Sequence, residues 1–503
     1  MNHPAGQTPA GHPTIWREQV TAKTHTVEKI GGTSMSRSQE LLRTVLVGDR
    51  KGPELYNRIF VVSAYGGMTD ALLEHKKSDE PGVYALFASA ESGWQWGDAL
   101  SSVASKMVEK NAEIFPDAAT REQADKFIRE RIEGVRSCLI DLSRLCSFGH
   151  FQLEAHLLTV REMLSALGEA QSAFNTALLL NQNGVNARFI DLTGWRQDGE
   201  LPLDEHIARQ FSGVDFATEL PIVTGYAQCA EQLMKTYDRG YSEVTLSRVA
   251  VVTGAKEAII HKEFHLSSAD PKLVGSDKVQ VIGETNYDVA DQLSNMGMEA
   301  IHPRAAKSLR QAGIPLRVTN AFEPDHPGTV IMSDLEPRTP GAEIITGLKG
   351  VFALEFYDQD MVGVKGYDTK ILESLTRHKV WIISKTSNAN TITHYLKGSM
   401  KAIKRVETDL AQAFPTATTT LRKLAMVSAI GRDLGGVRIL PRAIAALDEA
   451  GIEPIGLTDM IRKVDLQVLV EEKDFDAAII ALHRGLVEER AERKARADIR
   501  RVA

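Results

Sequence analysis

The chain has 503 residues, of which 43% are hydrophobic and 25% are charged. At about 100–200 residues per domain, this length predicts roughly three domains. Lys and Arg number 59 and Asp and Glu number 66, which gives a formal net charge of −7. A mildly acidic chain has no bulk attraction for phosphate backbones or anionic membranes, so we expect neither nucleic acid nor membrane as a partner.

Cysteine content and the N-terminus indicate the compartment. Three cysteines, Cys138, Cys146 and Cys229, are too few for a disulfide framework and lack metal-ligand spacing, so we expect buried free thiols. No apolar run is long enough to span a bilayer, and residues 1–25 lack the apolar core of a signal peptide. These features predict a soluble protein of the cytoplasm.

The first half of the chain alternates predicted strands and helices. Thr26–Ile30 is a short strand that ends at two glycines, and Arg58–Ala64 is an apolar run typical of a strand buried on both faces. Residues 94–182 are helical by pattern. Further strands are predicted at Ala187–Leu192, Leu220–Thr224, Val249–Thr253 and Val279–Ile282. This alternation, which ends near residues 325–328, predicts a three-layer α/β/α sandwich with a mainly parallel sheet.

The rhythm changes at about residue 344. A strand-helix-strand-strand-helix series runs to about residue 413, and a second series from about residue 421 repeats it, so the period is about 70 residues. Each copy matches the ferredoxin-like βαββαβ pattern. We therefore predict these units: a flexible tail at 1–25, a catalytic domain at 26–335, two small regulatory domains at 343–415 and 420–487, and a charged tail at 488–503.

A glycine loop follows the first predicted strand. It reads Lys29-Ile30-Gly31-Gly32-Thr33-Ser34. Two glycines let the backbone approach a ligand closely, and successive N–H groups can bind phosphate oxygens. Lys29 can place its charge on a transferring phosphoryl group. The alternative is an ordinary Gly-Gly turn with a solvated lysine, and neither a Rossmann nor a P-loop motif is present.

Three further segments carry polar residues that can bind a substrate. Ser63 ends a buried strand, with Thr69 beyond the turn, at the sheet edge where α/β folds bind ligands. Glu169 lies within an apolar helical pattern and can bind an ammonium group. Arg239 and Ser242 precede a helix, where Ser242 can cap it and Arg239 can clamp a carboxylate. Taken singly, each has a structural alternative: a capping serine or a solvent-facing glutamate.

The order and spacing of these segments resemble the aspartate kinases of the amino acid kinase family. The resemblance covers about residues 26–487 and includes the Lys29–Ser34 loop, the Val61-Val62-Ser63-Ala64 strand end and the Gly168-Glu169-Ala170-Gln171-Ser172 helix. It extends to Asp238–Glu243 and to Ile301-His302-Pro303. The repeat resembles the paired ACT domains of the family.

This resemblance implies transfer of the ATP γ-phosphoryl group to the side-chain carboxylate of L-aspartate, with Mg²⁺ held chiefly by the nucleotide. Lys29 and Glu243 would be catalytic, the glutamate orienting the lysine. The resemblance implies that the nucleotide is bound by Gly31, Gly32, Thr33, Ser34 and Lys272. It implies that aspartate is bound by Ser63, Thr69, Glu169, Tyr226, Arg239 and Ser242. No protein metal ligand is expected.

The chain departs from the family on the nucleotide side. His261-Lys262 replaces a Thr-Asp pair, Ser267 replaces a tyrosine, and Glu299 replaces a lysine. These changes favour a second hypothesis, a non-catalytic amino-acid-binding regulator that keeps the fold. A third hypothesis is a kinase for another carboxylate such as N-acetylglutamate. The spacing of His261 and His265 does not predict a metal pair, because they lie in a strand-like segment.

The regulatory side departs as well. The resemblance implies an amino-acid effector bound by Met361, Ser384 and Asn390, but Trp381 stands where the family has an effector-binding aspartate. We therefore expect weakened or absent lysine feedback. Such departures are similar to those of the specialised aspartate kinases that accompany ectoine synthesis. The ACT domains also imply a homo-oligomer.

Overall fold

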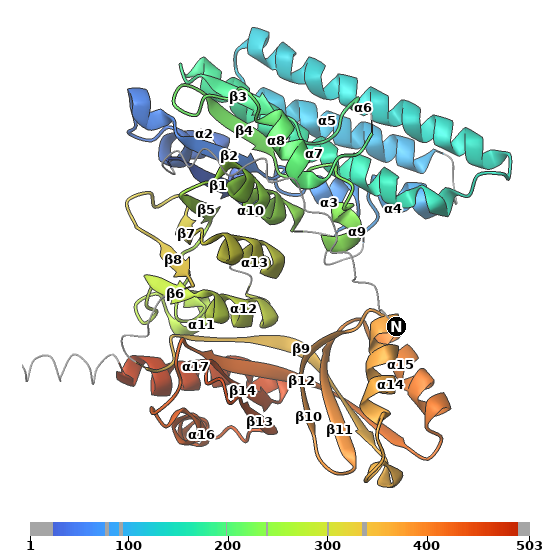
Figure 1. The fold of residues 1–503 in the computed structure, drawn as a ribbon, viewed down its shortest axis with the longest axis vertical. Coiled ribbons are helices and arrows are strands. Elements are labelled where there is room, and N and C mark those ends of the chain that lie inside the picture. The colour runs from blue at the N-terminus through green and yellow to red at the C-terminus, as the bar shows by residue number, and fades with distance from the viewer. Residues whose placement is uncertain are drawn as a thin grey trace, which may run out of the picture.

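A computed structural model describes residues 24–75, 80–89, 94–197, 199–237, 240–298, 301–333 and 340–490. It contains one eight-stranded and one six-stranded sheet, each covered by helices and stacked along the long axis of the molecule (Figure 1). Arg239 and Glu299, both of functional interest from the sequence, lie outside these described residues. Among the described helices, none has the length and apolarity needed to cross a membrane.

The eight-stranded sheet confirms the predicted α/β class. Its order is β3-β4-β2-β1-β5-β7-β8-β6, and every pair is parallel except β7 with β8. The strands are β1 Thr26–Ile30, β2 Arg58–Val62, β3 Ala187–Ile190, β4 Leu220–Thr224, β5 Glu257–Lys262, β6 Glu284–Asn286, β7 Leu316–Asn320 and β8 Thr329–Met332. Every residue of β2 and β4 is buried, because helices cover both faces of a parallel sheet.

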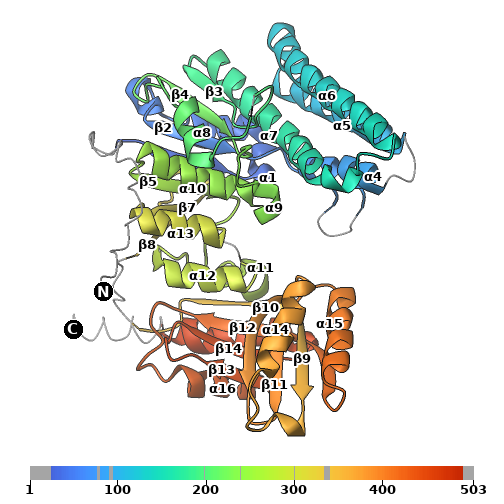
Figure 2. The ribbon, with the colours of Figure 1, turned by 45° about the vertical axis from the view of Figure 1, so that its right-hand side comes forward.

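Two helices define the outer layers around the strands that carry the site. Helix α7 (Leu157–Gln182) packs on β2, β3 and β4, and α10 (Tyr241–Thr253) packs on β1, β2 and β5. Alternate residues of β2 belong to different hydrophobic clusters, Val61 with Val249 of α10 and Phe60 with Leu180 of α7. The sandwich is therefore three layers thick. Two further long helices, α5 (Gln95–Ile114) and α6 (Ala118–Ser147), pack beside α7 (Figure 2).

The remaining helices of this body are short. They are α1 Gly32–Met35, α2 Ser38–Leu41, α3 Met68–Leu72, α4 Val83–Ser89, α8 Leu203–Gln210, α9 Leu233–Tyr237, α11 Pro271–Val274, α12 Tyr287–Asn295 and α13 Pro303–Ala312. The eight-stranded sheet and its helices form the upper body of the molecule in Figure 1. Figures 1 and 2 both show α12 at the side of this body that faces the six-stranded sheet.

Three predictions are wrong. Val249–Thr253 is the last part of α10, not a strand, because this helix is buried on nearly all sides and shows no polar face. Val279–Ile282 makes only an isolated bridge, through Val281, and the strand follows at β6. Of the three cysteines, only Cys229 is buried, and Cys138 is exposed.

The six-stranded sheet is antiparallel and contains both repeat units. Its order is β10-β11-β9-β12-β14-β13. Its elements are β9 Ile344–Tyr357, α14 Tyr367–Arg377, β10 Trp381–Ser387, β11 Thr391–Lys397, α15 Met400–Ala413, β12 Thr418–Ile430, α16 Ile439–Glu449, β13 Gly456–Asp459, β14 Asp465–Val470 and α17 Phe475–His483. This succession confirms the predicted tandem of ferredoxin-like units.

The two units share their longest strands. One half of β9, Phe352–Tyr357, lies between β11 and the first half of β12. The other half, Ile344–Leu348, pairs with the second half of β12, which also pairs with β14. Each unit therefore uses half of β9 and half of β12, and the register of β12 shifts between Leu424 and Met426, where the halves meet.

A hydrogen-bonded junction joins the two bodies. The N–H of Ile345, at the start of β9, donates to the carbonyl of Ser268 at 2.7 Å. The hydroxyl of Ser268 lies 2.9 Å from Nε2 of His483, in α17. Both side chains are fully buried, so this contact excludes water. The loop that follows β5 is thus fixed to the six-stranded sheet, which contains the two predicted regulatory units and is called the regulatory sheet below.

Candidate active site

The glycine loop lies at the carboxyl end of β1. Gly31 has an extended backbone, and the short helix α1 begins at Gly32. A Cβ atom added at Gly32 would lie 2.6 Å from the carbonyl oxygen of Ala64, so only glycine fits against the end of β2. Beyond it, Thr33 is exposed, while the buried Ser34 hydroxyl donates to Oε1 of Glu263 at 2.7 Å. The loop is therefore fixed on one side and open on the other.

Lys29 and Glu243 form the ion pair at the centre of the site. Nζ of Lys29 lies 3.4 Å from Oε1 of Glu243, and about nine-tenths of each side chain is buried. The second carboxylate oxygen accepts a hydrogen bond from the backbone N–H of His302. Lysine at the end of β1 and glutamate in the first turn of α10 meet because α10 packs across β1.

The charge of Glu243 is retained despite its burial. Burial raises the pKa of Glu243, but the charges of Lys29 and Lys262 lower it, and the N–H of His302 lowers it further. The net pKa lies below the ordinary value, so Glu243 is a carboxylate at neutral pH. Lys262 ends β5, the neighbour of β1, and thus adds a second positive charge beside this pair.

Three polar residues meet at the backbone of Gly225. The hydroxyls of Ser63 and Ser242 lie 3.1 Å apart. A Cβ atom at Gly225, just after β4, would lie 2.7 Å from Cβ of Ser242 and 2.9 Å from Oε2 of Glu169. The structure therefore brings Ser63, Ser242 and Glu169 together around the bare backbone of Gly225.

The buried carboxyl group of Glu169 can bind a positively charged group of a ligand. Its side chain is 2% exposed, and its Oε2 has no hydrogen-bond partner among the residues that the structure describes. Burial raises the pKa of Glu169 well above its usual range, while the charge of Lys29 and the N–H of Ala64 lower it. A buried acid of this kind gains its counter-ion when a ligand ammonium group arrives.

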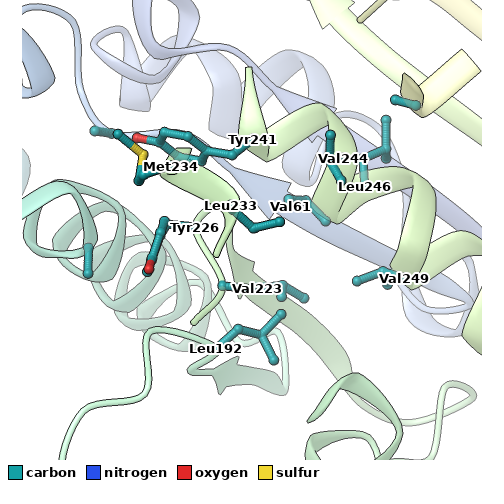
Figure 3. Close-up of a cluster of buried hydrophobic side chains, with 14 of the residues drawn as sticks. Val61, Leu192, Val223, Tyr226, Leu233, Met234, Tyr241, Val244, Leu246 and Val249 are labelled. Atoms are coloured by element: carbon teal, nitrogen blue, oxygen red, sulfur yellow. The ribbon is translucent and has the colours of Figure 1, made fainter. Parts of the chain in front are cut away.

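Other predicted site residues are placed less directly. Thr69 is half-buried in the first turn of α3. The ring of Tyr226 packs edge-to-face against Tyr241 at 5.6 Å and belongs to the buried hydrophobic cluster drawn in Figure 3. The role of Arg239 stays a prediction, because the residue lies outside the described part of the chain.

Lys272 lies at a cavity between the two bodies. Asp270 caps α11, and its Oδ1 accepts from the N–H of Lys272 at 2.9 Å. The cavity holds about 450 Å³. It is lined, among others, by Phe264, Ser267, Lys272, Met298, Ile345 and Phe475. The cavity is therefore bounded by the segment after β5, the end of α12, the start of β9 and α17.

His261 belongs to a buried ionic cluster that sequence reasoning missed. Its Nε2 lies 2.8 Å from Oε2 of Glu28, and Nε of Arg58 donates to Oε1 of Glu28 at 2.9 Å. His265 instead lies 3.1 Å from Glu323. The two histidines therefore have separate carboxylate partners. Neighbouring strands bring Glu28, Arg58 and His261 together, a proximity that no local sequence signal reveals.

The predicted effector residues lie in the first unit of the regulatory sheet. The carbonyl of Asn390 accepts from the N–H of Asp358, whose own carbonyl accepts from the N–H of Met361. Met361 and Asn390 are thus neighbours at one end of β9. Ser384 is buried in the middle of β10, opposite Tyr395. Trp381, at the start of β10, is 65% exposed.

Residues 25–320 match the model of the amino acid kinase family. The chain belongs to this family, since the match spans more than half of its length. Aspartate kinase Ask_Ect of Stutzerimonas stutzeri is 56% identical over 464 residues, covering 92% of this chain and 98% of that protein. The chloroplastic aspartokinase 2 of Arabidopsis thaliana is 22% identical over 489 residues, covering 92% and 84%.

Solved structures share the fold along nearly the whole chain. Aspartokinase III of E. coli, in complex with aspartate and ADP, aligns with a TM-score of 0.68 at 17% identity, covering 92% of this chain and 99% of that one. Aspartate kinase of Clostridium acetobutylicum aligns with a TM-score of 0.66 at 20% identity, covering 92% and 99%. At these identities the likeness concerns the fold alone, and it includes both sheets.

Proposed function

We propose that this protein is an aspartate kinase, which transfers the γ-phosphoryl group of ATP to the side-chain carboxylate of L-aspartate and gives 4-aspartyl phosphate. The 56% identity to an aspartate kinase over nearly the whole chain supports this activity. The observation that carries it is the buried Lys29–Glu243 pair beside Glu169, Ser63 and Ser242. In this arrangement a fixed positive charge lies near a buried acid whose Oε2 has no hydrogen-bond partner among the described residues.

The chemistry needs no catalytic base. A carboxylate nucleophile is already ionised at neutral pH, so catalysis consists of holding two anions in line and neutralising the transferring group. In this proposal Lys29 supplies that positive charge, and Glu243 positions the lysine. Glu169 receives the ammonium group of aspartate, and the Ser63 and Ser242 hydroxyls bind its oxygen atoms. Thr69, Tyr226 and Arg239 complete the substrate site by resemblance.

The nucleotide is expected on the side of the glycine loop. The N–H groups of Gly31–Ser34 would bind its phosphates, and Lys272, which lines the cavity between the two sheets, would reach it from that side. Mg²⁺, held chiefly by the phosphates, would neutralise charge on the transferring group. The Ser34 hydroxyl and the Glu263 carboxylate are oxygen donors of the kind that Mg²⁺ prefers, so these residues fit the ion.

The regulatory sheet is proposed to bind an amino acid at Met361, Ser384 and Asn390 and to join copies of the chain into a homo-oligomer. Trp381 in place of an acid removes a charge that a basic effector needs, so lysine feedback would be weak. That property suits an enzyme of the cytoplasm that supplies ectoine synthesis while other amino acids are abundant. The intact Lys29–Glu243 pair disfavours the alternative of a non-catalytic regulator. Trapping the acyl phosphate with hydroxylamine tests the activity.

A further inference from the structure

A second cavity lies beside Tyr226, in the body built on the eight-stranded sheet. It holds about 420 Å³ and lies between α6 and α7. The loops after β3 and β4, at the carboxyl ends of these strands, close it. Ligands of open α/β sheets bind at this edge. None of Lys29, Glu169 or Ser242 lines it.

The cavity wall contains a buried acid, Glu162, that forms no ion pair with any residue in the described part of the chain. Glu162 of α7 is 8% exposed, and its Oε1 has no hydrogen-bond partner among the described residues. Burial raises the pKa of Glu162; an N–H of Met234 lowers it, and the charge of Glu200 raises it. A buried carboxylate of this kind is unfavourable until a cation lies beside it.

The basic residues at the cavity already have their counter-ions. Arg131 is bound to the side chains of Asp191 and Thr193, and Arg196 lies 3.0 Å from Glu130. The arginines therefore do not offer an anion a free charge. Among the described residues, Glu162 is the charged group of this wall for which no ion pair is found, so the cavity favours a positive ligand.

Two aromatic residues give the cavity apolar walls. Tyr226 is buried beside Tyr241 and Val223 (Figure 3), and Trp195 lies on the bare backbone of α6 at Gly134. A Cβ atom at Gly134 would lie 2.4 Å from the Trp195 ring, so glycine is required for this packing. The guanidinium groups of Arg131 and Arg196 already lie over the Trp195 ring, 5.2 and 5.9 Å from its centroid. The aromatic walls therefore serve to bury the apolar part of an organic cation.

We propose that this cavity is a second ligand site, which binds a small organic cation with an ammonium or amidinium head on an apolar body. Glu162 is the counter-ion of the head, and Trp195 and Tyr226 contact the body. The site is distinct from the substrate site, although the two share Tyr226 as a wall, because Glu162 and Glu169 are seven residues apart on α7, about 10 Å along the helix. Tyr226 directly follows Gly225, whose backbone lies against Glu169. A cation bound beside Tyr226 would therefore lie close to the substrate site.

Binding of benzylamine, with benzyl alcohol as its neutral isostere, tests the site. We expect calorimetry on the full chain to show benzylamine bound at millimolar concentration or below, and at least tenfold weaker in Glu162→Gln. Glutamine keeps the shape and removes the charge, so the variant should fold; Glu205→Gln, at an exposed position of α8, is the matched control and should bind as wild type. Benzyl alcohol should not distinguish the variants.

Cysteine labelling locates the ligand. Cys138 lines the cavity and is exposed, whereas Cys146 lies eight residues further along α6 and does not line it. Benzylamine should slow the reaction of Cys138 with iodoacetamide severalfold and leave Cys146 unchanged.

Binding must also persist in Glu169→Gln, since the substrate acid is not part of this site. Loss of benzylamine binding in Glu169→Gln, or equal binding by wild type and Glu162→Gln, would overturn the proposal. No binding to the wild type would overturn it as well. None of these results depends on kinase activity, so failure here leaves the proposed function standing.

Discussion

Nζ of Lys29 lies 3.4 Å from Oε1 of Glu243, and this ion pair joins the end of β1 to the first turn of α10. The contact spans 214 residues of sequence, so it exists only when the sheet and its covering helix are assembled. It fixes a lysine at the edge of the sheet where the glycine loop and Glu169 meet.

Removal of the lysine charge should abolish turnover without unfolding the protein. Because preorganised charges at a transferring group each contribute roughly 10²–10³ in rate, Lys29→Ala should lower kcat at least about a hundredfold. Kinase assays measure this, and circular dichroism melting checks the fold. Lys256→Ala, near β5 and outside the site, is the control that should retain activity. A change below about threefold in Lys29→Ala would show that the assigned role is wrong.

Glu243 should act through Lys29 rather than on substrate. Glu243→Gln keeps the shape but releases the lysine from its ion pair, so kcat should fall about tenfold or more while KM for aspartate changes little. Glu243→Asp, one methylene shorter, should recover part of kcat. Equal rises in KM for Glu243→Gln and Glu243→Asp, with kcat unchanged, would indicate a binding role instead.

The raised pKa of Glu169 predicts pH-dependent binding of aspartate. The ionised form binds the ammonium group, and burial raises the pKa, so the protonated fraction increases as pH falls. KM for aspartate should therefore rise as pH is lowered across the range in which the protein stays folded, with less change in KM for ATP. In Glu169→Gln the KM should be high and nearly independent of pH. A wild-type KM that is constant over this range would contradict the assignment.

The Glu28–Arg58–His261 cluster should stabilise the upper body. Loss of one member of a buried pair costs about 3–5 kcal/mol, so Glu28→Gln should destabilise the protein by that order in urea unfolding. The pKa of Glu28 is lowered, since Arg58 and His261 outweigh its burial. This stabilisation is present above the unfolded pKa of about 4.3 and is lost as pH falls through the folded pKa. Glu28→Gln should therefore be less sensitive to acid, and Glu133→Gln, exposed on α6, should match wild type.

Lysine should not inhibit this enzyme at sub-millimolar concentration. Trp381 is exposed at the start of β10 and supplies no charge for a lysine side chain. Trp381→Asp should increase sensitivity to lysine, with Trp381→Asn as the uncharged control. Inhibition of the wild type by sub-millimolar lysine would refute the expectation.

Local patterns could predict much of the fold. The apolar runs of β1, β2 and β4 predict a parallel sheet, and the order of strands and helices after residue 344 predicts the repeat. The run Val249–Thr253 misleads because a helix buried on all sides carries the same β-branched residues as a buried strand. The sharing of β9 and β12 between the units was also not predictable, because strand length does not reveal how partners divide it.

Some residues of the candidate site could be predicted from the sequence, and others could not. Lys29 could be singled out because the glycine loop is contiguous in sequence, and resemblance singled out Glu169. The partner of Ser34, Glu263, and the cluster around Glu28 could not be found, since their contacts cross between strands far apart in the chain. Glu162 likewise looks like any helical glutamate until its burial is known.

The most direct test of the central claim is the hydroxamate assay on pure protein with ATP, Mg²⁺, L-aspartate and hydroxylamine. Wild type should form aspartyl hydroxamate only when both ATP and aspartate are present, and Lys29→Ala should form almost none. N-acetylglutamate in place of aspartate should give no product. The absence of hydroxamate from folded wild-type protein, or its formation with N-acetylglutamate alone, would contradict the assignment of aspartate kinase.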